Sequence, residues 1–215
     1  MCTRFYIDKE DKELTEIGAA ACQSPLAKRF MTSFGRPILT DGEIRPTDIV
    51  PVIAPNKKER RAVFPMRWGF TLPRSSQPLV NARVETASSK PTFIEAWQRH
   101  RCIIPASWYY EWEHYTTPDG KQRTGDKYLI QPANASITWL CGLYRFEDGF
   151  PVFTILTQDA VGEQARIHDR MPVILPEDMT NEWIKIDADP DNILSHALTD
   201  MIMEKTSTTT KQAHA

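Results

Sequence analysis

Short strand-like segments separated by prolines run along the whole chain, and this pattern limits the folds that it can adopt. The chain holds 16 prolines but only 9 glycines in 215 residues, whereas average usage is about 5% proline and about 7% glycine. Such a composition favours many fixed loops and few glycine-rich phosphate loops. Strand patterns outnumber helix patterns and are scattered among them. We therefore expect an α+β protein with a curved, mainly antiparallel, barrel-like β-sheet and short peripheral helices.

The expected elements follow from apolar alternation and from turn signals. We expect strands at 3–7, 43–54, 61–70, 101–112, 127–132, 136–145 and 151–157. We expect helices within 9–30, interrupted near Ser24-Pro25, at 91–100, and near 159–164, 177–184 and 190–199. Pro65 predicts an edge strand or a bulge, because proline cannot donate to a strand ladder.

Length and composition favour a single domain. The chain has 215 residues, of which 41% are hydrophobic and 25% charged, as is usual for one globular domain. We expect this domain to span residues 2–204 and the polar residues 205–215 to form a disordered tail. No apolar run approaches 18 residues, so we expect no membrane span.

The charges are distributed unevenly. Residues 1–130 hold 20 Lys and Arg against 15 Asp and Glu, whereas residues 131–215 hold 6 against 13. This asymmetry suggests an anionic partner bound by one face. The alternative is that both halves pack into one domain and the charges mix.

The cysteines and histidines show no familiar metal-binding spacing. There is no CxxC pair and no HExxH motif among 4 cysteines and 5 histidines. The N-terminal stretch is charged where a signal peptide would be apolar. We therefore expect free thiols, no metal and a cytoplasmic location.

Cys2 is the first residue whose position has a chemical consequence. Removal of Met1 would expose Cys2 as a 1,2-aminothiol, whose amine can condense with an aldehyde and whose thiolate can then close a thiazolidine ring. An α-amino group has a pKa of about 7.7–8, and a thiol near 8.5 needs only a modest lowering by a nearby arginine. The alternative is an unremarkable cysteine at a frayed terminus, but the apolar segment that follows should be drawn into a sheet.

Two further segments combine polar groups that suit an anionic ligand or a proton transfer. Asn81 and Arg83 lie two residues apart before a predicted helix and could hold a phosphate or a sugar. His168 and Arg170 share a face of an extended segment, where they would supply a proton near neutrality and a clamp for an anion. The alternatives are a helix cap beside a surface arginine, and a lone surface histidine.

Glu111 lies among aromatic residues on a predicted strand. Strand alternation sends Glu111 and Glu113 to one face and the neighbouring Tyr110 and Trp112 to the other. A carboxyl group beside bulky aromatics can have a raised pKa, which suits proton transfer. The alternative is two solvated carboxylates.

A basic run at 57–61 lies close in sequence to Arg67 and Trp68. A basic groove with aromatic faces binds single-stranded nucleic acid without reading its sequence. The alternative is a solvated loop followed by a tryptophan in the core.

Six segments in order resemble the SOS response-associated peptidase (SRAP) family, whose members crosslink to abasic sites in DNA. They cover about residues 1–185. The segments are Met1-Cys2-Thr3-Arg4-Phe5, Arg67-Trp68-Gly69, Asn81-Ala82-Arg83-Val84-Glu85-Thr86, Arg101-Cys102-Ile103-Ile104-Pro105-Ala106, Tyr110-Glu111-Trp112 and His168-Asp169-Arg170-Met171-Pro172. The chain departs from the family pattern at Thr3, at Trp108 and in a polar insert around 114–126.

The resemblance implies a function, a partner and a set of site residues. After Met1 removal, Cys2 would form a thiazolidine crosslink with an abasic site in single-stranded DNA, with no metal or organic cofactor and with the protein as a monomer, nucleoid-associated when engaged on DNA. Lyase activity and autoproteolytic loss of Met1 are possible side activities. The implied catalytic residues are Cys2, Asn81, Glu111 and His168, and the implied DNA-binding residues are Arg4, Arg67, Trp68, Arg83 and Arg170. Within this set, Glu111 and His168 would move protons, Asn81 would position Cys2 or the sugar, and Trp68 would stack on a base.

Two other functions are compatible with the same residues. A thiol peptidase would use Cys2 with His168 as its base. A passive module would bind single-stranded DNA through its arginines and tryptophans, with no role for Cys2.

Overall fold

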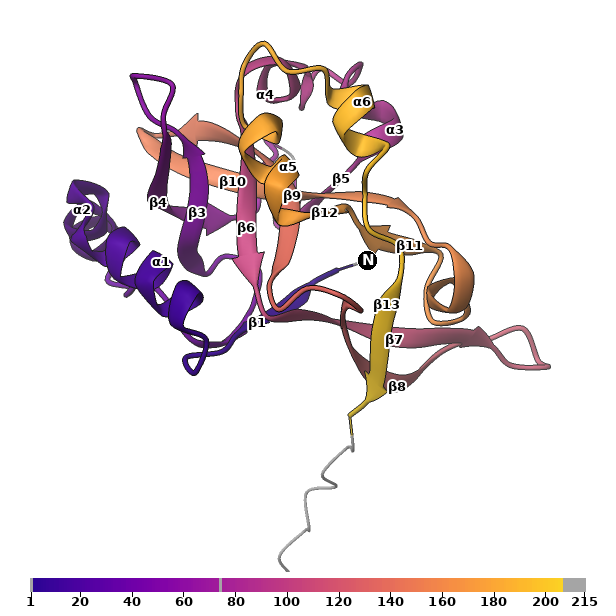
Figure 1. Cartoon of the computed structure of the whole chain (residues 1–215). Coiled ribbons are helices and arrows are strands. Elements are labelled where there is room, and N and C mark those ends of the chain that lie inside the picture. The colour runs from indigo at the N-terminus through magenta and orange to yellow at the C-terminus, as the bar shows by residue number, and fades with distance from the viewer. Residues whose placement is uncertain (1, 74, 207–215) are drawn as a thin grey trace, which may run out of the picture.

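A closed five-stranded β-barrel forms the centre of the structure (Figure 1). The computed structural model describes residues 2–73 and 75–206. Around the ring the order is β4, β3, β6, β9 and β10, and β10 then pairs with β4. Every neighbouring pair is antiparallel except β10 with β4. The bounds are β3 (Ile49–Pro55), β4 (Arg61–Trp68), β6 (Arg101–Ala106), β9 (Thr138–Glu147) and β10 (Phe150–Asp159).

The barrel is filled by apolar side chains. All six residues of β6 are buried, and so are the first six of β3. Gly142 marks the tightest approach, because a Cβ there would lie 2.5 Å from Ile104 Cδ1 and 2.8 Å from the carbonyl oxygen of Thr154. Pro65 is paired only on the side facing β3, since β10 reaches β4 only at Arg67 and Trp68. The expected edge strand or bulge at Pro65 is therefore wrong, because β4 lies between β3 and β10 and pairs with β3 in unbroken register; the proline is tolerated where β10 does not pair with it.

Three very short strands extend the barrel. β5 (Asn81–Arg83) and β11 (Arg170–Pro172) both pair with β10, and β12 (Ile174–Leu175) pairs with β9. The sequence did not predict them, because two or three residues are too few to show an alternation. Two of them carry segments named above, the one that starts with Asn81 and the one that contains Arg170.

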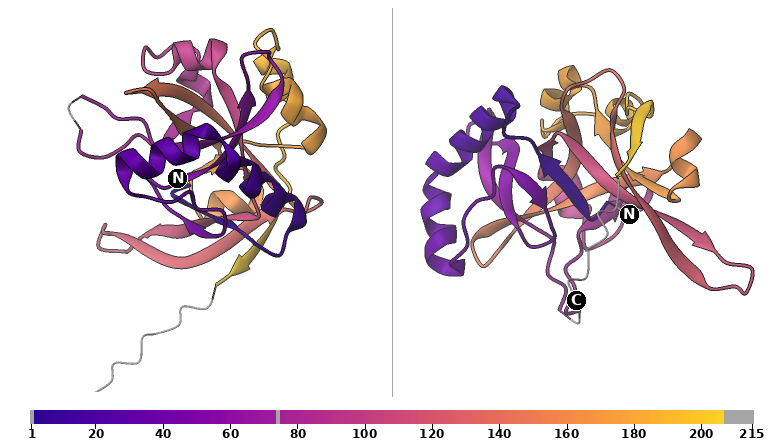
Figure 2. Two further views of the ribbon diagram at one scale, coloured as in Figure 1. Left: turned by 90° about the vertical axis from the view of Figure 1, so that its left-hand side faces the viewer. Right: turned by 90° about the horizontal axis from the view of Figure 1, so that it is seen from below.

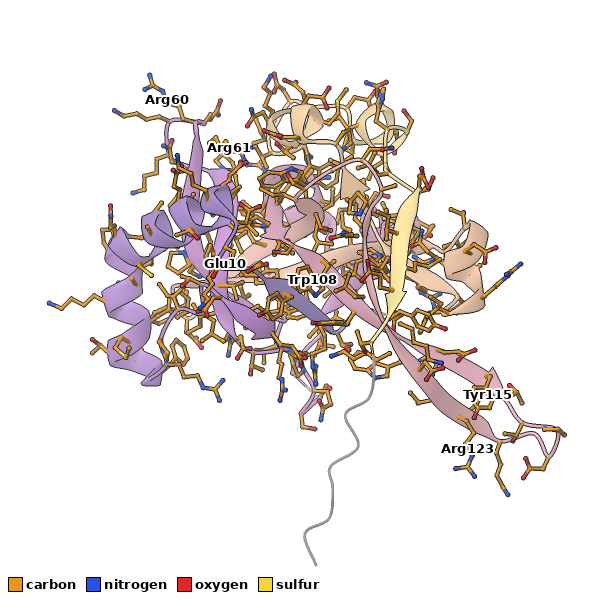
Figure 3. All side chains as sticks on the ribbon, turned by 60° about the horizontal axis from the view of Figure 1, so that its bottom comes forward. Glu10, Arg60, Arg61, Trp108, Tyr115 and Arg123 are labelled. Atoms are coloured by element: carbon orange, nitrogen blue, oxygen red, sulfur yellow. The ribbon has the colours of Figure 1, made fainter. Side chains whose placement is uncertain are left out.

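A second sheet lies beside the barrel, in the order β13, β8, β7, β1, β2. Its β7–β8 hairpin projects from the body of the molecule (Figure 2), and Figure 3 shows Tyr115 and Arg123 on the projecting part. The polar insert is therefore strand for most of its length, and Tyr115 pairs with Arg123. The bounds are β1 (Arg4–Ile7), β2 (Gly42–Ile44), β7 (Trp108–Thr116), β8 (Gln122–Pro132) and β13 (Met201–Lys205).

The helices are short and peripheral. Ser24 ends α1 (Lys12–Gln23) and caps α2 (Pro25–Phe34), where Pro25 occupies the first turn. The predicted interruption near Ser24-Pro25 is therefore confirmed. The remaining helices are α3 (Val84–Ala87), α4 (Ile94–Arg99), the 3₁₀ helix η1 (Gly162–Arg166), α5 (Glu177–Trp183) and α6 (Pro190–Leu194).

The structure confirms the expected α+β class, with a curved, mainly antiparallel, barrel-like sheet and short outer helices. The boundary expected at residue 205 falls inside a strand, because Lys205 ends β13 and the backbone N–H of Thr206 donates to the carbonyl of Lys127. The rest of the expected tail, 207–215, lies outside the described residues. Within 2–73 and 75–206, no helix combines the length and apolar character needed to cross a bilayer.

Candidate active site between the barrel and the second sheet

Cys2 is fixed in the structure and fully buried, at 0% exposure. It lies two residues before the start of β1, which lies between β2 and β7 in the second sheet, with Arg4 opposite Tyr110. The side-chain Nδ2 of Asn81 donates to the carbonyl oxygen of Cys2 at 2.9 Å. The alternative of a frayed terminus is therefore wrong, because sheet pairing and a buried hydrogen bond hold Cys2 in place.

Asn81 reaches Cys2 from the barrel. It begins β5, which pairs with β10, and its residue exposure is 6%. Its Oδ1 is buried and accepts no hydrogen bond within the part of the chain that the structure describes. A buried amide oxygen without a donor is costly, so this atom is available to a donor that enters the site.

The pKa of the Cys2 thiol is raised to about 12, mainly by burial and also by the negative charge of Glu111. The positive charge of the N-terminus acts in the opposite direction. The expected lowering by an arginine is wrong, because Arg4 forms an ion pair with Glu43 at 3.3 Å. The thiol instead donates to the Arg4 carbonyl at 3.7 Å.

Glu111 and His168 come from different parts of the fold, a strand of the second sheet and a loop next to the barrel. Glu111 lies on β7 at 3% exposure, and its Oε1 accepts from the backbone N–H of Trp112 at 3.1 Å. His168 lies between η1 and β11. The structure therefore brings Cys2, Asn81 and Glu111 into one region, with His168 close enough to feel the charges of Glu111 and of the N-terminus.

The His168 ring has two partners at one nitrogen. Nδ1 lies 3.0 Å from the backbone nitrogen of Arg170 and 2.6 Å from Oδ1 of Asp169. A neutral Nδ1 without hydrogen accepts from Arg170, whereas a protonated Nδ1 donates to Asp169. Burial lowers the pKa of His168, and the positive N-terminus adds to this. At neutral pH the ring is therefore mostly uncharged and can accept a proton.

His114 is a site residue that the sequence did not predict. The pairing of β7 with β8 shifts register between Trp112 and His114. The histidine rings of His114 and His168 lie 5.1 Å apart at 89°. No local sequence signal marks a bulge here, so only the structure identifies His114.

Arg170 is committed to the protein rather than to a ligand. Its guanidinium is 5% exposed and forms ion pairs with Glu85, at 2.8 Å, and with Asp159. It also donates to the carbonyl of Thr157 at 2.7 Å. In this structure the guanidinium of Arg170 is thus paired within the fold and not exposed for the predicted phosphate contact. The pair with Glu85 instead joins the segment of Asn81 to the segment of His168.

Trp68 and Arg67 are also used within the fold. Trp68 is 0% exposed and its Nε1 donates to the Val80 carbonyl at 3.0 Å, so in this structure its ring is not exposed for the predicted stacking on a base. Arg67 pairs with Glu147 at 3.1 Å. The alternative given above, a tryptophan in the core, is the correct one.

Arg83 is the exposed arginine nearest to Asn81 in sequence. It ends β5, and within residues 2–73 and 75–206 the structure gives it no side-chain hydrogen bond or ion pair. Arg4 is partly exposed beside Glu43. Trp108, a departure from the family pattern, stacks on Tyr6 with ring centroids 4.5 Å apart.

The fold is therefore a barrel with an adjoining open sheet, and its candidate site lies at their junction, where a buried cysteine is hydrogen-bonded by an asparagine, and a glutamate and a histidine lie within electrostatic range. The family model described as SOS response associated peptidase (SRAP) matches residues 1–212. The chain therefore belongs to the SRAP family, as the ordered segments indicated.

Several known proteins resemble the chain. The abasic site processing protein YoqW of Bacillus subtilis (strain 168) is 31% identical over 73% of this chain and 75% of its own length. The abasic site processing protein YoaM of the same strain is 33% identical, over 55% of each chain, so the match spans little more than half of YoaM. A solved structure of a protein from Bacteroides thetaiotaomicron has a TM-score of 0.69 at 20% identity, covering 96% of this chain and 92% of that one. This last likeness concerns the fold.

Proposed function

We propose that this protein captures abasic sites in single-stranded DNA through a covalent bond to Cys2. The observation that carries the proposal is the fixed, buried Cys2 at the second position, with the Asn81 amide on its carbonyl. Relatives with about 30% identity are named abasic site processing proteins. Family membership over residues 1–212 supports the same function.

The chemistry starts with hydrolysis of the Met1–Cys2 peptide bond, which consumes one water and frees the Cys2 amine. This amine adds to C1′ of the ring-opened sugar aldehyde, and loss of one water gives an imine. The Cys2 sulfur then adds to the imine carbon, and the thiol proton ends on the nitrogen. The product is a five-membered thiazolidine in which no atom has been oxidised or reduced.

Removal of Met1 would also activate the thiol. The positive N-terminal charge already lowers the pKa of Cys2, and this charge would move onto the nitrogen of Cys2 itself. A closer positive charge lowers a thiol pKa further. The free Oδ1 of Asn81 would accept a hydrogen bond from the freed amine or from a sugar hydroxyl.

Glu111 and His168 would move the protons. The neutral ring of His168 can accept the proton that the amine or the thiol loses. The buried carboxyl of Glu111 can return a proton to the departing water or to the sugar oxygen. Ring closure matters because an imine promotes β-elimination and strand cleavage, whereas a thiazolidine does not.

The structure makes the two alternatives less suitable. A thiol peptidase needs an activated thiolate, but the pKa of Cys2 is raised before Met1 is removed. A passive module would bind through Trp68 and Arg170, and both are used inside the fold. We propose that Arg83 and Arg4 contact the DNA backbone, that the protein acts as a cytoplasmic monomer, nucleoid-associated on DNA, and that capture uses no organic cofactor.

The test is intact mass of the purified protein, followed by denaturing electrophoresis after mixing with an abasic single-stranded oligonucleotide. We expect a mass without Met1 and a heat-stable adduct with the abasic strand. Cys2→Ala should abolish the adduct, whereas Cys22→Ala, which changes an exposed cysteine elsewhere, should leave it intact. Retained Met1 with no adduct would refute covalent capture.

A further inference from the structure

Three metal-ligating side chains come together beside Cys2. One ligand atom of each of Glu111, His114 and His168 lies within 4.8 Å of the other two. Glu111 is buried, His168 half-buried and His114 exposed, so the group is open to solvent on one side. The sequence suggested no metal, because these residues are not spaced as in any metal-binding motif.

Two features of the backbone bring the group together. The pairing of β7 with β8 shifts register between Trp112 and His114, and ligand atoms of Glu111 and His114 lie within 4.8 Å of each other beside this shift, although an unbroken strand would send residues 111 and 114 to opposite faces. The backbone N–H of His114 then donates to the carbonyl of Ile167 at 3.0 Å, which fixes β7 next to the residue before His168. In Figure 1 the segment around β11 lies above β7.

We propose that Glu111, His114 and His168 form a binding site for a divalent transition-metal ion, and that zinc suits it best. Two imidazoles and one carboxylate are a frequent ligand set for zinc with one position left open. Asp169 lies 2.6 Å from Nδ1 of His168. A carboxylate at this nitrogen orients a histidine for metal binding through its other nitrogen.

Metal binding would compete with DNA capture, and this part rests on the proposed function. The ion would occupy Glu111 and His168, the two residues proposed to move protons. Arg4 pairs with Tyr110, the residue before Glu111, which brings Cys2 to the region of Glu111. After Met1 removal, the amine and the thiol of Cys2 would therefore be available for the open position. Bound zinc would thus hold the reactive residue in an inactive, reversible complex.

The first experiment measures Zn²⁺ binding by the full chain in competition with a chromophoric chelator. We expect one ion per chain. Replacing His114 should weaken binding at least about tenfold, since loss of an outer partner alone costs about 10–100-fold. The fold should tolerate the substitution His114→Gln, because His114 is exposed. The matched control is His196→Gln, which changes another exposed histidine. Equal binding by the wild type and His114→Gln would overturn the site.

The second experiment measures the rate of adduct formation with and without Zn²⁺. We expect Zn²⁺ to slow the wild-type reaction and to leave His114→Gln unaffected. Equal inhibition of both proteins would overturn the competition. If the wild type forms no adduct in metal-free buffer, the proposed function fails, but the binding experiment still decides the metal site.

A Co²⁺ titration tests whether Cys2 fills the open position of the metal ion. A thiolate-to-cobalt charge-transfer band that Cys2→Ala removes would support Cys2 as the fourth ligand. A cobalt spectrum without that band, and unchanged in Cys2→Ala, would overturn that assignment.

Discussion

The barrel and the second sheet contribute to the site in different ways. The barrel is closed, so it has no free edge at its centre, and four of its strands, β3, β6, β9 and β10, are buried over most of their length. The second sheet is open and carries a long hairpin into solvent (Figure 3). The open sheet supplies Cys2 and Glu111. The short strands on the barrel supply Asn81, which begins β5, and position His168, which lies just before β11.

This difference shows where a reactive group can be held without losing its reactivity. The barrel core has no room for polar chemistry, because an unpaired polar group there would be costly. The junction combines the rigidity of the barrel with side chains near the surface, since His168 is half-buried and His114 exposed. Hydrogen bonds and ion pairs across the junction then decide the geometry of the site.

The largest effect should come from Cys2→Ser, which keeps the amine and removes the thiol. We expect no heat-stable adduct, but an imine that borohydride can trap and that leads to strand cleavage. The measurement is electrophoresis of the abasic strand with and without borohydride. A heat-stable adduct without borohydride would show that the sulfur is not needed.

The next effect tests the hydrogen bond from the barrel to the second sheet. Asn81→Ala should slow adduct formation by about 100-fold, because a misplaced reacting group can cost that much, and the bond to Cys2 is lost. Single-turnover kinetics measure the rate. Asn134→Ala, in an exposed loop, is the control and should react like the wild type.

Arg170 is predicted to matter for stability rather than for DNA binding. Arg170→Met should lower the free energy of unfolding by about 2 kcal/mol. Breaking a fully buried ion pair costs about 3–5 kcal/mol, but the side chains of Glu85 and Asp159 are 43% and 83% exposed, so the loss should be smaller. Arg166→Met, which breaks an exposed pair, should cost less than about 1 kcal/mol. Urea unfolding compares the two, and equal losses would contradict the role given to Arg170.

Alkaline pH should destabilise the fold through its buried thiols. Burial raises the pKa of Cys2, Cys102 and Cys141, so the unfolded chain releases these protons first as pH rises past about 8.5. Stability is then fully present below that pH and falls above it, by about 1 kcal/mol per thiol at pH 9. Cys2→Ala should remove the share of this loss that comes from one thiol. The measurement is the free energy of unfolding as a function of pH, and a value that stays constant between pH 7 and 9 would contradict the prediction.

The smallest effect concerns Arg83. Arg83→Gln should weaken binding to intact single-stranded DNA and reduce the slope of log affinity against log salt by about 0.7 for one phosphate contact. Fluorescence anisotropy at several salt concentrations measures the slope. Arg170→Met should leave the slope unchanged, since its guanidinium is already paired.

Much of the fold follows from local patterns. The strands β1, β3, β4, β9 and β10 and the break between α1 and α2 lie where apolar alternation, turns and proline predict them. The short strands β5, β11 and β12 could not be predicted, because they exist only through pairing with β9 and β10. The arginines show the same limit of prediction, because the sequence does not reveal that Arg83 is exposed whereas Arg170 is buried in ion pairs.

The sequence by itself determined the α+β class, the SRAP family and the presence of a cysteine at the second residue with an asparagine, a glutamate and a histidine in a set order. These properties depend on composition, periodicity and residue order. Only the tertiary structure decided the closure of the barrel, the burial of Trp68, the pairing of Arg170 with Glu85 and the position of His114 beside His168. The physical reason is that burial and pairing depend on contacts between segments far apart in the chain.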